Sequence, residues 1–391
     1  MFRGVIAITA LNLASISRRM GSSLVIVIGI AGVVGVMISV LAMAQGFLET
    51  MSHTGQSDRA IVLRGGSQAE LSSTLTRDQA IAIADGPGVK TDADGHTIQS
   101  AEVVAVINLP LRATGTDANV TLRGVGPQAF ELRPDMKLVE GRMFQPGLRE
   151  LIVGKSAKGQ FSGLDLGSHI AFRDSEWTVV GVFDTPDSHG SEVIGDVDTV
   201  LAALRRNMFQ SVTVELTSPD AFDAYKQALT SDPRLAVEVM RETDYYARVG
   251  AQLAKLLKFI GYVVGGIMAV GALFGALNTM YSAVSARTIE IATLRAIGFG
   301  ATPILVSVFV EALILSLAGA AIGAFLAWAF FNGNTLNSLS GNFTQVVFHL
   351  EVTWPLVGLG IAWAAVIGLI GGLFPALRAA RRPVVEALRG G

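Results

Sequence analysis

Four long apolar runs divide this chain into segments of very different polarity. The runs cover residues 22–45, 255–283, 303–331 and 354–375. A helix needs about 20 apolar residues to cross a lipid bilayer, so each run is long enough. Hydrophobic residues make up 51% of the chain and charged residues only 16%, and the charges largely avoid the runs. The pattern predicts a helical membrane protein with four transmembrane helices.

The segment between the first and second runs has the pattern of a folded α/β domain. Short β-type runs alternate in it with helix signals such as Thr76 followed by Gln79, a capping box, and Ser218-Pro219, an N-cap with a first-turn proline. We expect a domain of ordinary size over residues 46–254. A mostly β part, about 101–196, is inserted into an α/β part, about 46–100 and 197–250.

Basic residues indicate which side of the membrane each short segment occupies, because Lys and Arg are enriched in cytoplasmic loops. The basic residues of the short segments are Arg3, Arg18, Arg19, Arg287, Arg295, Arg378, Arg381, Arg382 and Arg389. The loop at 332–353 has no Lys or Arg. We therefore predict that an N-terminal helix at 1–21, the segment 284–302 and the tail 376–391 are cytoplasmic, and that 46–254 and the short loop 332–353 lie on the other side.

The first apolar run also has features of a cleaved signal peptide. Arg18 and Arg19 precede it, and Ala42-Met43-Ala44 resembles a cleavage site. The apolar core of a signal peptide has only about 7 to 15 residues, and this run is longer, so we expect an uncleaved first helix. The chain has no cysteine, which leaves its redox compartment undetermined, because disulfides outside the membrane are permitted and not required.

A short charged segment, NTMYSAVSARTIEIATLRAIGFGATPI at 278–304, joins the second and third runs. Its apolar residues recur at helical spacing: Ile289, Leu294 and Ile297. Arg287 and Glu290 form an i,i+3 pair, and Gly298 is a natural helix stop. Such a helix either contacts a cytoplasmic protein or lies on lipid headgroups, and the spacing alone favours neither.

Asn278 lies within the second apolar run and Glu311 within the third. An ionisable group inside the bilayer costs several kcal/mol unless it finds a partner. A proton relay needs a chain of such groups, and the runs offer few others. We therefore interpret Glu311 as a structural hydrogen-bonding residue at a helix contact.

Small residues recur four positions apart in each apolar run, a spacing that lets helix backbones approach closely. The pairs are Ala31 with Gly35, Gly271 with Gly275, Gly319 with Gly323, and Gly368 with Gly372. The spacing predicts tight helix packing, either within one chain or between two copies.

Several segments together resemble the MacB/FtsX-type permeases of ABC transporters. They are the stretch 278–304, the tail GGLFPALRAARRPVVEALRG at 371–390, RGVGP at 123–127, EGR at 140–142 and VVGVF at 179–183. The resemblance covers nearly the whole chain. It implies a multi-pass protein of the bacterial inner membrane with a periplasmic domain of two lobes, Porter-like (about 46–100 and 197–250) and Sabre-like (about 101–196). It also implies a homodimer whose seam lies on the first two runs.

The resemblance further implies a mechanical role, in which a cytoplasmic ATPase drives motion of the periplasmic domain. The implied ATPase-coupling residues are Arg287, Glu290, Ile291, Leu294, Arg295 and Gly298. Arg378, Arg381 and Arg382 in the tail are a second implied cytoplasmic contact. No G-x-x-x-x-G-K-[ST] phosphate loop occurs in the chain, so we expect ATP and Mg²⁺ to bind a separate ATPase subunit.

No pattern of catalytic residues stands out, and the chain is not predicted to be an enzyme or to bind nucleic acid. Residues 124–129 match G-x-G-x-x-A, but Pro127 stands where a phosphate-binding helix begins. The acidic stretch 183–198, which contains His189, matches no calcium-loop template. We interpret it as a solvated loop and expect no metal or cofactor on this chain.

Four functions remain open at this point. The first is efflux with a periplasmic adaptor and an outer-membrane channel. The second is lipoprotein release, whose permeases act as a pair of different chains. The third is mechanical regulation of a periplasmic enzyme, as by FtsX proteins, although their periplasmic domain is usually much smaller. The fourth is a membrane receptor that only binds a ligand, against which the resemblance of the 284–302 segment argues.

Overall fold

The computed structural model describes residues 20–339 and 345–381, which fold into two units. The membrane unit comprises Met1–Gln45, Leu256–Asn334 and Leu350–Gly391, as far as these are described. The extramembrane unit comprises Gly46–Lys255 together with Thr335–His349. The predicted N-terminal helix at 1–21 falls almost entirely outside the described residues.

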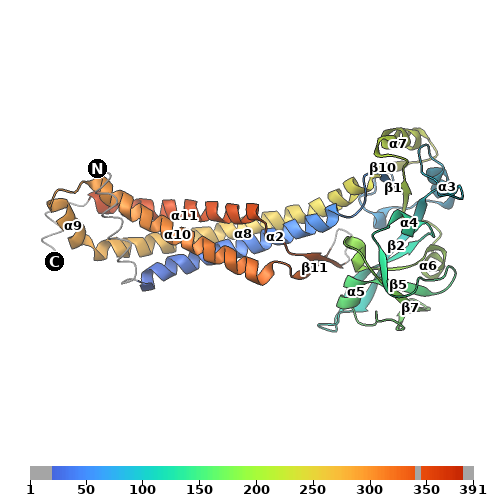
Figure 1. Ribbon diagram of the computed structural model, residues 1–391, viewed down its shortest axis with the longest axis horizontal. Helices are drawn as coiled ribbons and strands as arrows, with labels where there is room; N and C mark the ends of the chain where they lie inside the picture. Colours follow the sequence, from blue (N-terminus) through green and yellow to red (C-terminus); the bar gives the residue numbers. More distant parts are fainter. Residues whose placement is uncertain (1–19, 340–344, 382–391) are drawn as a thin grey trace. The chain divides into compact units, whose positions relative to one another are not determined.

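The membrane unit is built from four helices that are long and apolar enough to cross a bilayer. They are α2 (Met20–Ser52), α8 (Glu242–Ala286), α10 (Ala301–Phe331) and α11 (Trp354–Arg381). In Figure 1 they run side by side, with the short helix α9 (Thr288–Ala296) at one end of the bundle. Two of them continue beyond the apolar runs, since α2 ends at Ser52 and α8 begins at Glu242.

The small residues of α2, α10 and α11 bring these helices into close contact. A Cβ atom on Gly323 would collide with the backbone of Ala31, and one on Gly319 would lie 2.8 Å from the carbonyl oxygen of Val27. Gly35 faces Gly323 from α2. On α11, a Cβ on Gly368 would meet Ser316 and one on Gly372 would meet Ala312, both on α10. Gly271 and Gly275 on α8 instead face open space in the described chain.

The extramembrane unit is organised around one mixed sheet in the order β10-β1-β9-β2-β3-β8-β5-β7-β4, with β6 also paired to β7. The strands are β1 (Arg59–Arg64), β2 (Gln99–Pro110), β3 (Asp117–Val125), β4 (Lys137–Gly141), β5 (Glu150–Gly154), β6 (His169–Phe172), β7 (Ser175–Asp184), β8 (Glu192–Asp196), β9 (Ser211–Glu215) and β10 (Val237–Arg241). β3 pairs with β8, and β5 with β7, in parallel.

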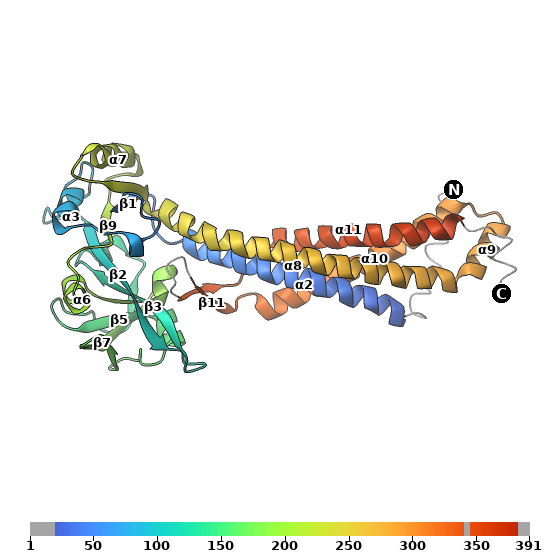
Figure 2. The same ribbon diagram turned by 180° about the vertical axis from the view of Figure 1, so that it is seen from behind.

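Strand β2 changes partner after its fourth residue. Residues Gln99 to Glu102 pair with β9, whereas Val103 to Pro110 pair with β3. Figure 2 shows β2 and β3 running from the β1–β9 part of the sheet towards β5 and β7. Glu102 therefore stands at the point where the two parts of the sheet meet.

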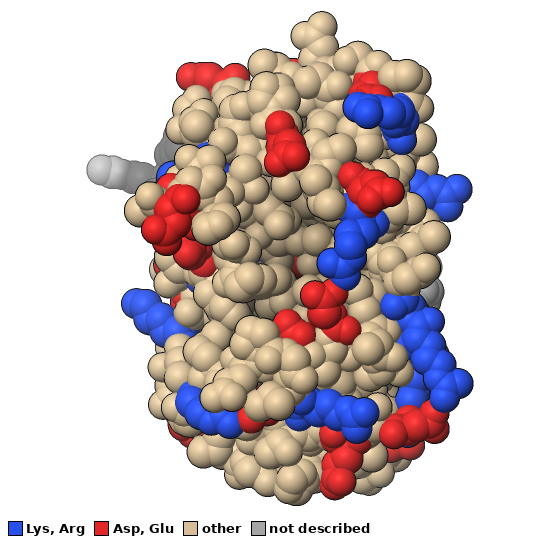
Figure 3. All heavy atoms as spheres, turned by 90° about the vertical axis from the view of Figure 1, so that its right-hand side faces the viewer, with Lys and Arg blue, Asp and Glu red and all other residues tan. Residues whose placement is uncertain are grey.

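Short helices cover this sheet and complete its apolar core. They are η2 (Glu70–Ser72), α3 (Arg77–Ala84), α4 (Ala129–Leu132), α5 (Lys155–Gln160), η3 (Ser188–Ser191), α6 (Val197–Leu204), η4 (Pro219–Ala221) and α7 (Phe222–Ser231). The predicted capping box is confirmed, because the Thr76 side chain accepts from the backbone N–H of Gln79 and the Gln79 side chain accepts from that of Thr76. On the outer face shown in Figure 3, acidic and basic side chains are interspersed.

Two segments differ from their sequence interpretation. The stretch 183–198 is not a solvated loop: it contains η3 and the central strand β8, and every residue of β8 is buried. Of the two acidic residues in β8, Glu192 pairs with Arg123 of β3, and Asp196 accepts from the backbone N–H groups of Gly147 and Thr199. The predicted loop 332–353 contains a hairpin of β11 (Thr335–Leu339) and β12 (Gln345–His349) that belongs to the extramembrane unit.

We predict that Gly323→Ala destabilises the membrane unit by about 1–3 kcal/mol, because the added methyl group overpacks the α2–α10 contact. Gly358→Ala on α11 is the matched control, since a Cβ there meets nothing within 4 Å. Thermal unfolding in detergent compares the two variants. Equal melting temperatures for both would contradict the close contact.

Candidate functional site

Helix α9 presents an apolar surface at the end of the membrane unit. Ile289 and Ile297 are 55% and 68% exposed, and Glu290 beside them is exposed as well. Ile291, Leu294 and Arg295, three of the predicted coupling residues, are half-buried. Gly298 has a positive φ of 103° and ends this part of the chain. The exposed face thus carries isoleucine side chains that the fold of the described residues leaves accessible.

Arg287 occupies a different place from the other predicted coupling residues. It is buried at the junction between α8 and α9. Its Nη1 donates to Oε2 of Glu311 on α10 over 3.3 Å. A buried ion pair therefore fixes the start of α9 to α10. This pair supplies a partner for the carboxylate that sequence analysis placed inside an apolar run.

A small cavity adjoins the ion pair. Its volume is about 30 Å³, and both Arg287 and Glu311 line it together with Leu294. A cavity of this size holds about one water molecule. The junction of α8, α9 and α10 is thus closely packed.

The other predicted polar residues of the membrane unit lie apart from this junction. Arg378 on α11 stands over the ring of Tyr281 on α8, with its Cζ 5.5 Å from the ring centre. Arg381 is exposed at the end of α11, and Arg382 lies outside the described residues. Asn278 is exposed on α8. The Arg378–Tyr281 contact ties the end of α11 to the end of α8.

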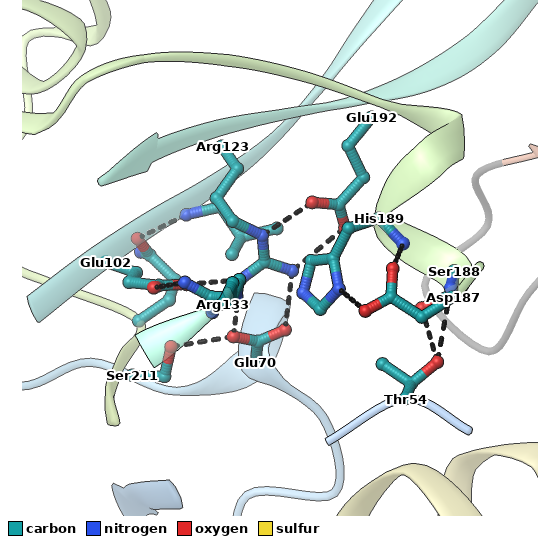
Figure 4. Close-up of polar contacts among 12 residues, drawn as sticks. Thr54, Glu70, Glu102, Arg123, Arg133, Asp187, Ser188, His189, Glu192 and Ser211 are labelled. Atoms are coloured by element: carbon teal, nitrogen blue, oxygen red, sulfur yellow. Dashed lines mark hydrogen bonds and ion pairs between the residues drawn. The ribbon is translucent and has the colours of Figure 1, made fainter. Parts of the chain in front are cut away.

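The extramembrane unit contains a buried charged cluster that sequence analysis did not identify. At its centre is Arg123 of β3, only 2% exposed. Its guanidinium donates to Glu70 at 2.9 and 3.1 Å, to Glu102 at 2.7 Å and to Glu192 at 2.7 and 2.9 Å. Arg133 donates to the second oxygen of Glu102 at 2.7 Å. Figure 4 shows these side chains converging from η2, β2, β3 and β8.

The electrostatics of this cluster keep its carboxylates ionised. Burial alone raises the pKa of Glu102, but the charges of Arg133 and Arg123 outweigh it and lower that pKa to about 2. Arg123 likewise lowers the pKa of Glu70 against the effect of burial. Ser211 and the Tyr245 hydroxyl also contact Glu70, at its carboxylate and its backbone N–H respectively. Charges buried in this way are stable only as a fully paired set.

His189 extends the same network at its edge (Figure 4). Its Nδ1 lies 3.2 Å from Oδ2 of Asp187, and its Nε2 lies 3.2 Å from the hydroxyl of Tyr246 on α8. Burial lowers the pKa of His189, but Asp187 and then Glu192 outweigh it, so the net pKa is raised. The raised pKa widens the pH range in which the imidazolium is the favoured form.

The sequence does carry a signal for this cluster. Arg123 stands within the β-type run VTLRGV and Glu102 within SAEVVAVI, each a single charge among apolar residues. A lone charge in a buried strand needs a partner. The sequence does not show which partner, because the charged residues that meet are as far apart as Glu70 and Glu192.

Comparisons with known proteins agree with this arrangement. The family model of the MacB-like periplasmic core domain matches residues 22–232. The model of the FtsX-like permease C-terminal domain matches residues 262–384.

Individual relatives are similar over nearly the whole chain. The macrolide export ATP-binding/permease protein MacB of Neisseria meningitidis (serogroup A) is 28% identical over 96% of this chain. That alignment spans only 59% of the MacB protein. The uncharacterized ABC transporter permease YknZ of Bacillus subtilis is 24% identical over 96% of this chain and 97% of its own length.

Two solved structures are also similar. The periplasmic region of MacB from Actinobacillus actinomycetemcomitans shares 17% identity at a TM-score of 0.38, over 51% of this chain and 94% of that one. The extracellular domain of the YknZ transporter shares 20% at a TM-score of 0.36, over 46% and 99%. These scores are too low to add to the family assignment.

We predict that Glu311→Gln destabilises the membrane unit by about 3–5 kcal/mol, because it leaves Arg287 buried without its carboxylate. The double variant Arg287→Met/Glu311→Gln should recover part of this loss. A double-mutant cycle measured by thermal unfolding in detergent tests the pair. Strictly additive effects of the two substitutions would show that it contributes nothing.

We predict a stability optimum for the extramembrane unit between about pH 4.5 and 6.5. Glu102 contributes stability above its unfolded pKa, and this is lost as the pH falls from 4.5 towards about 2. His189 contributes stability below its unfolded pKa of 6.5, and this is lost as the pH rises through its raised folded value. Urea unfolding of the full chain in detergent at about pH 6 and pH 9 measures the second effect.

His189→Gln is the control variant for this pH profile. It should lower the free energy of unfolding by about 1–3 kcal/mol at pH 6, because a buried hydrogen bond to a charged group contributes about that much. The difference in free energy of unfolding between this variant and the parent chain should be smaller at pH 9. A difference that stays constant over this range would show that His189 is not protonated in the fold.

Proposed function

This chain belongs to the family of proteins with a MacB-like periplasmic core domain and an FtsX-like permease domain, and on that basis we propose that it is the transmembrane subunit of an ABC transporter. A separate cytoplasmic ATPase binds ATP and Mg²⁺ and drives the cycle. The permease converts that cycle into motion of its extramembrane unit.

One observation carries this proposal: α9 is at once exposed and rigidly attached. Its Ile289 and Ile297 offer apolar side chains to a partner, while the Arg287–Glu311 pair fixes its start to α10. A surface that receives force needs both properties, because a flexible attachment absorbs the displacement. A helix that only lies on lipid headgroups needs an exposed apolar surface but no rigid attachment.

The direction of the chain in the membrane follows from its basic residues. Arg295, Arg378 and Arg381 lie at the α9 end of the membrane unit. Cytoplasmic segments are enriched in such residues, so we place α9 and both termini in the cytoplasm and the extramembrane unit in the periplasm.

Efflux with a periplasmic adaptor and an outer-membrane channel is the transport mode that we propose. The MacB relatives are named as macrolide export proteins, which supports export as the direction. The change of partner along β2 at Glu102 and Val103 supports a division of the extramembrane unit into a Porter-like and a Sabre-like lobe. An adaptor would bind the surface of these lobes, which is of mixed charge on the face shown in Figure 3.

The active unit is proposed to be a homodimer. Gly271 and Gly275 on α8 leave space that no described residue of the chain fills. Small residues of this kind allow two helices to pack closely in a membrane. A second copy that contacts α8 and α2 would use this space, whereas the glycines of α10 and α11 are already packed within one chain.

The proposal is tested by affinity purification of the full chain from its native membrane in mild detergent, followed by mass spectrometry of the stoichiometric partners. We expect an ABC ATPase, with an adaptor, in the parent complex. Ile289→Asp/Ile297→Asp should lose the ATPase at least tenfold, because burying two charged side chains at an interface costs well over about 1.4 kcal/mol.

Ile81→Asp is the matched control, because Ile81 is a similarly exposed isoleucine, at 57%, on α3 of the extramembrane unit. It should retain the ATPase in full. An ATPase that stays bound to the α9 variant overturns the contact assigned to α9. A parent chain that brings down no ATPase overturns the transporter function itself.

A further inference from the structure

Three segments that connect the two units meet on a single turn of the extramembrane unit. The turn is η3, Ser188–Ser191. The segments are the end of α2, the start of α8 and the hairpin between α10 and α11. Each makes its own contact with η3, and all of these contacts lie inside the extramembrane unit.

The end of α2 is attached through Thr54, two residues after the helix. Its hydroxyl lies 3.2 Å from Oγ of Ser188 and accepts from the backbone N–H of Ser188 at 3.2 Å. Thr54 has no exposed surface. The same hydroxyl also lies 2.9 Å from the carbonyl oxygen of Thr50 within α2. Thr54 thus links the last turn of α2 directly to the first residue of η3.

The start of α8 is attached through Tyr246. Its hydroxyl lies 3.2 Å from Nε2 of His189, and the two rings stand edge to face with their centres 5.8 Å apart. The charged or titratable groups that act on His189 are Asp187, Glu192, Arg133 and Tyr246. A tyrosine hydroxyl can donate to a neutral imidazole or accept from a charged one, so this contact survives a change in protonation.

The hairpin is attached through β12. The backbone N–H of Val347 donates to Oγ of Ser191 at 2.9 Å. The ring of Phe348 packs edge to face against Phe47 of α2, with ring centres 5.5 Å apart. Ser188, His189 and Ser191 therefore each contact a different connecting segment.

The turn leads directly into the middle of the sheet. Glu192, the residue after η3, begins β8 and binds the guanidinium of Arg123. β8 in turn pairs with β3 on one side and β5 on the other. Any displacement of η3 is thus applied to β8 and, through Arg123, to the residues on both parts of the sheet.

We propose that η3 is the joint through which movements of the transmembrane helices enter the periplasmic sheet, with Thr54 and Tyr246 as its positioning residues. The inference rests on the transporter function proposed above and deepens it. The joint is permanent: it stays closed throughout the cycle and carries the displacement of α2 and α8 to β8.

The joint is tested in the full chain bound to its ATPase, by hydrogen exchange of the β3 and β8 amides with and without ATP plus vanadate. Thr54→Val removes the hydroxyl and keeps the shape of the side chain. It should lower the nucleotide-dependent change in exchange by about twofold or more, the range for residues on a coupling path. Thr50→Val is the matched control, because that hydroxyl bonds only within α2, to the carbonyl of Gly46, and it should leave the change intact.

A covalent bond at the same place should have the opposite effect. The chain has no cysteine, so Thr54→Cys/Ser188→Cys introduces one pair, at positions whose hydroxyl oxygens are 3.2 Å apart. After addition of an oxidant, the disulfide should form equally with and without nucleotide, and the exchange response should keep the size that it has in the parent chain.

The outcomes separate the joint from the transporter function. The joint is overturned if Thr54→Val keeps the full nucleotide-dependent change in hydrogen exchange. It is also overturned if the disulfide abolishes that change. If Thr54→Val does not fold, Tyr246→Phe, which removes only a hydroxyl, decides by the same measurement. If the parent chain binds the ATPase but its hydrogen exchange does not change with nucleotide, the joint is also overturned. If the parent chain binds no ATPase, the transporter function is overturned.

Discussion

The extramembrane unit depends on the burial of one guanidinium. Arg123 is held by Glu70, Glu102 and Glu192 and lies where the two parts of the sheet meet. Hydrogen bonds between buried charges are strong when every group is paired, and removal of one partner is costly because the others stay charged. The cluster therefore fixes the relative position of η2, β2, β3 and β8 more narrowly than apolar packing does, since apolar contacts are not directional.

The membrane unit uses close packing for most of its contacts and charge at particular element junctions of its described residues. Along α2, α10 and α11, glycines bring the backbones together, which suits a bilayer because lipid chains offer no apolar driving force between helices. At the junction of α8 and α9 the Arg287–Glu311 pair adds an ion pair to this packing. An ion pair is directional, so the short helix α9 keeps a fixed position relative to α10.

Under the proposed function, these two charged sites would carry force through a chain with few charges in its core. Force is transmitted by parts that move together, and both sites join segments that are distant in the sequence. Arg287 and Glu311 hold the proposed ATPase contact to a long helix, and η3 with Arg123 holds the ends of other long helices to the sheet. Between them, α2 and α8 are continuous helices that require no joint.

The sequence by itself determined the elements whose cause is local. Apolar length gave the four long helices, since about 20 residues must be apolar to cross a bilayer. The capping box at Thr76 likewise depends on neighbours along the chain. The short helix α9 and its exposed isoleucines were also predicted from spacing.

Only the tertiary structure decided which charges meet. The acidic stretch 183–198 looked solvated because Arg123, the partner of Glu192, comes from another strand. Arg287 looked like a surface residue because Glu311 is 24 positions away. The hairpin β11–β12 was missed because its stability comes from contacts with η3 and α2. Backbone geometry and contact with solvent determine the local patterns. The partner of a buried charge is determined by the fold, and the spacing of residues in the sequence does not show which residue it is.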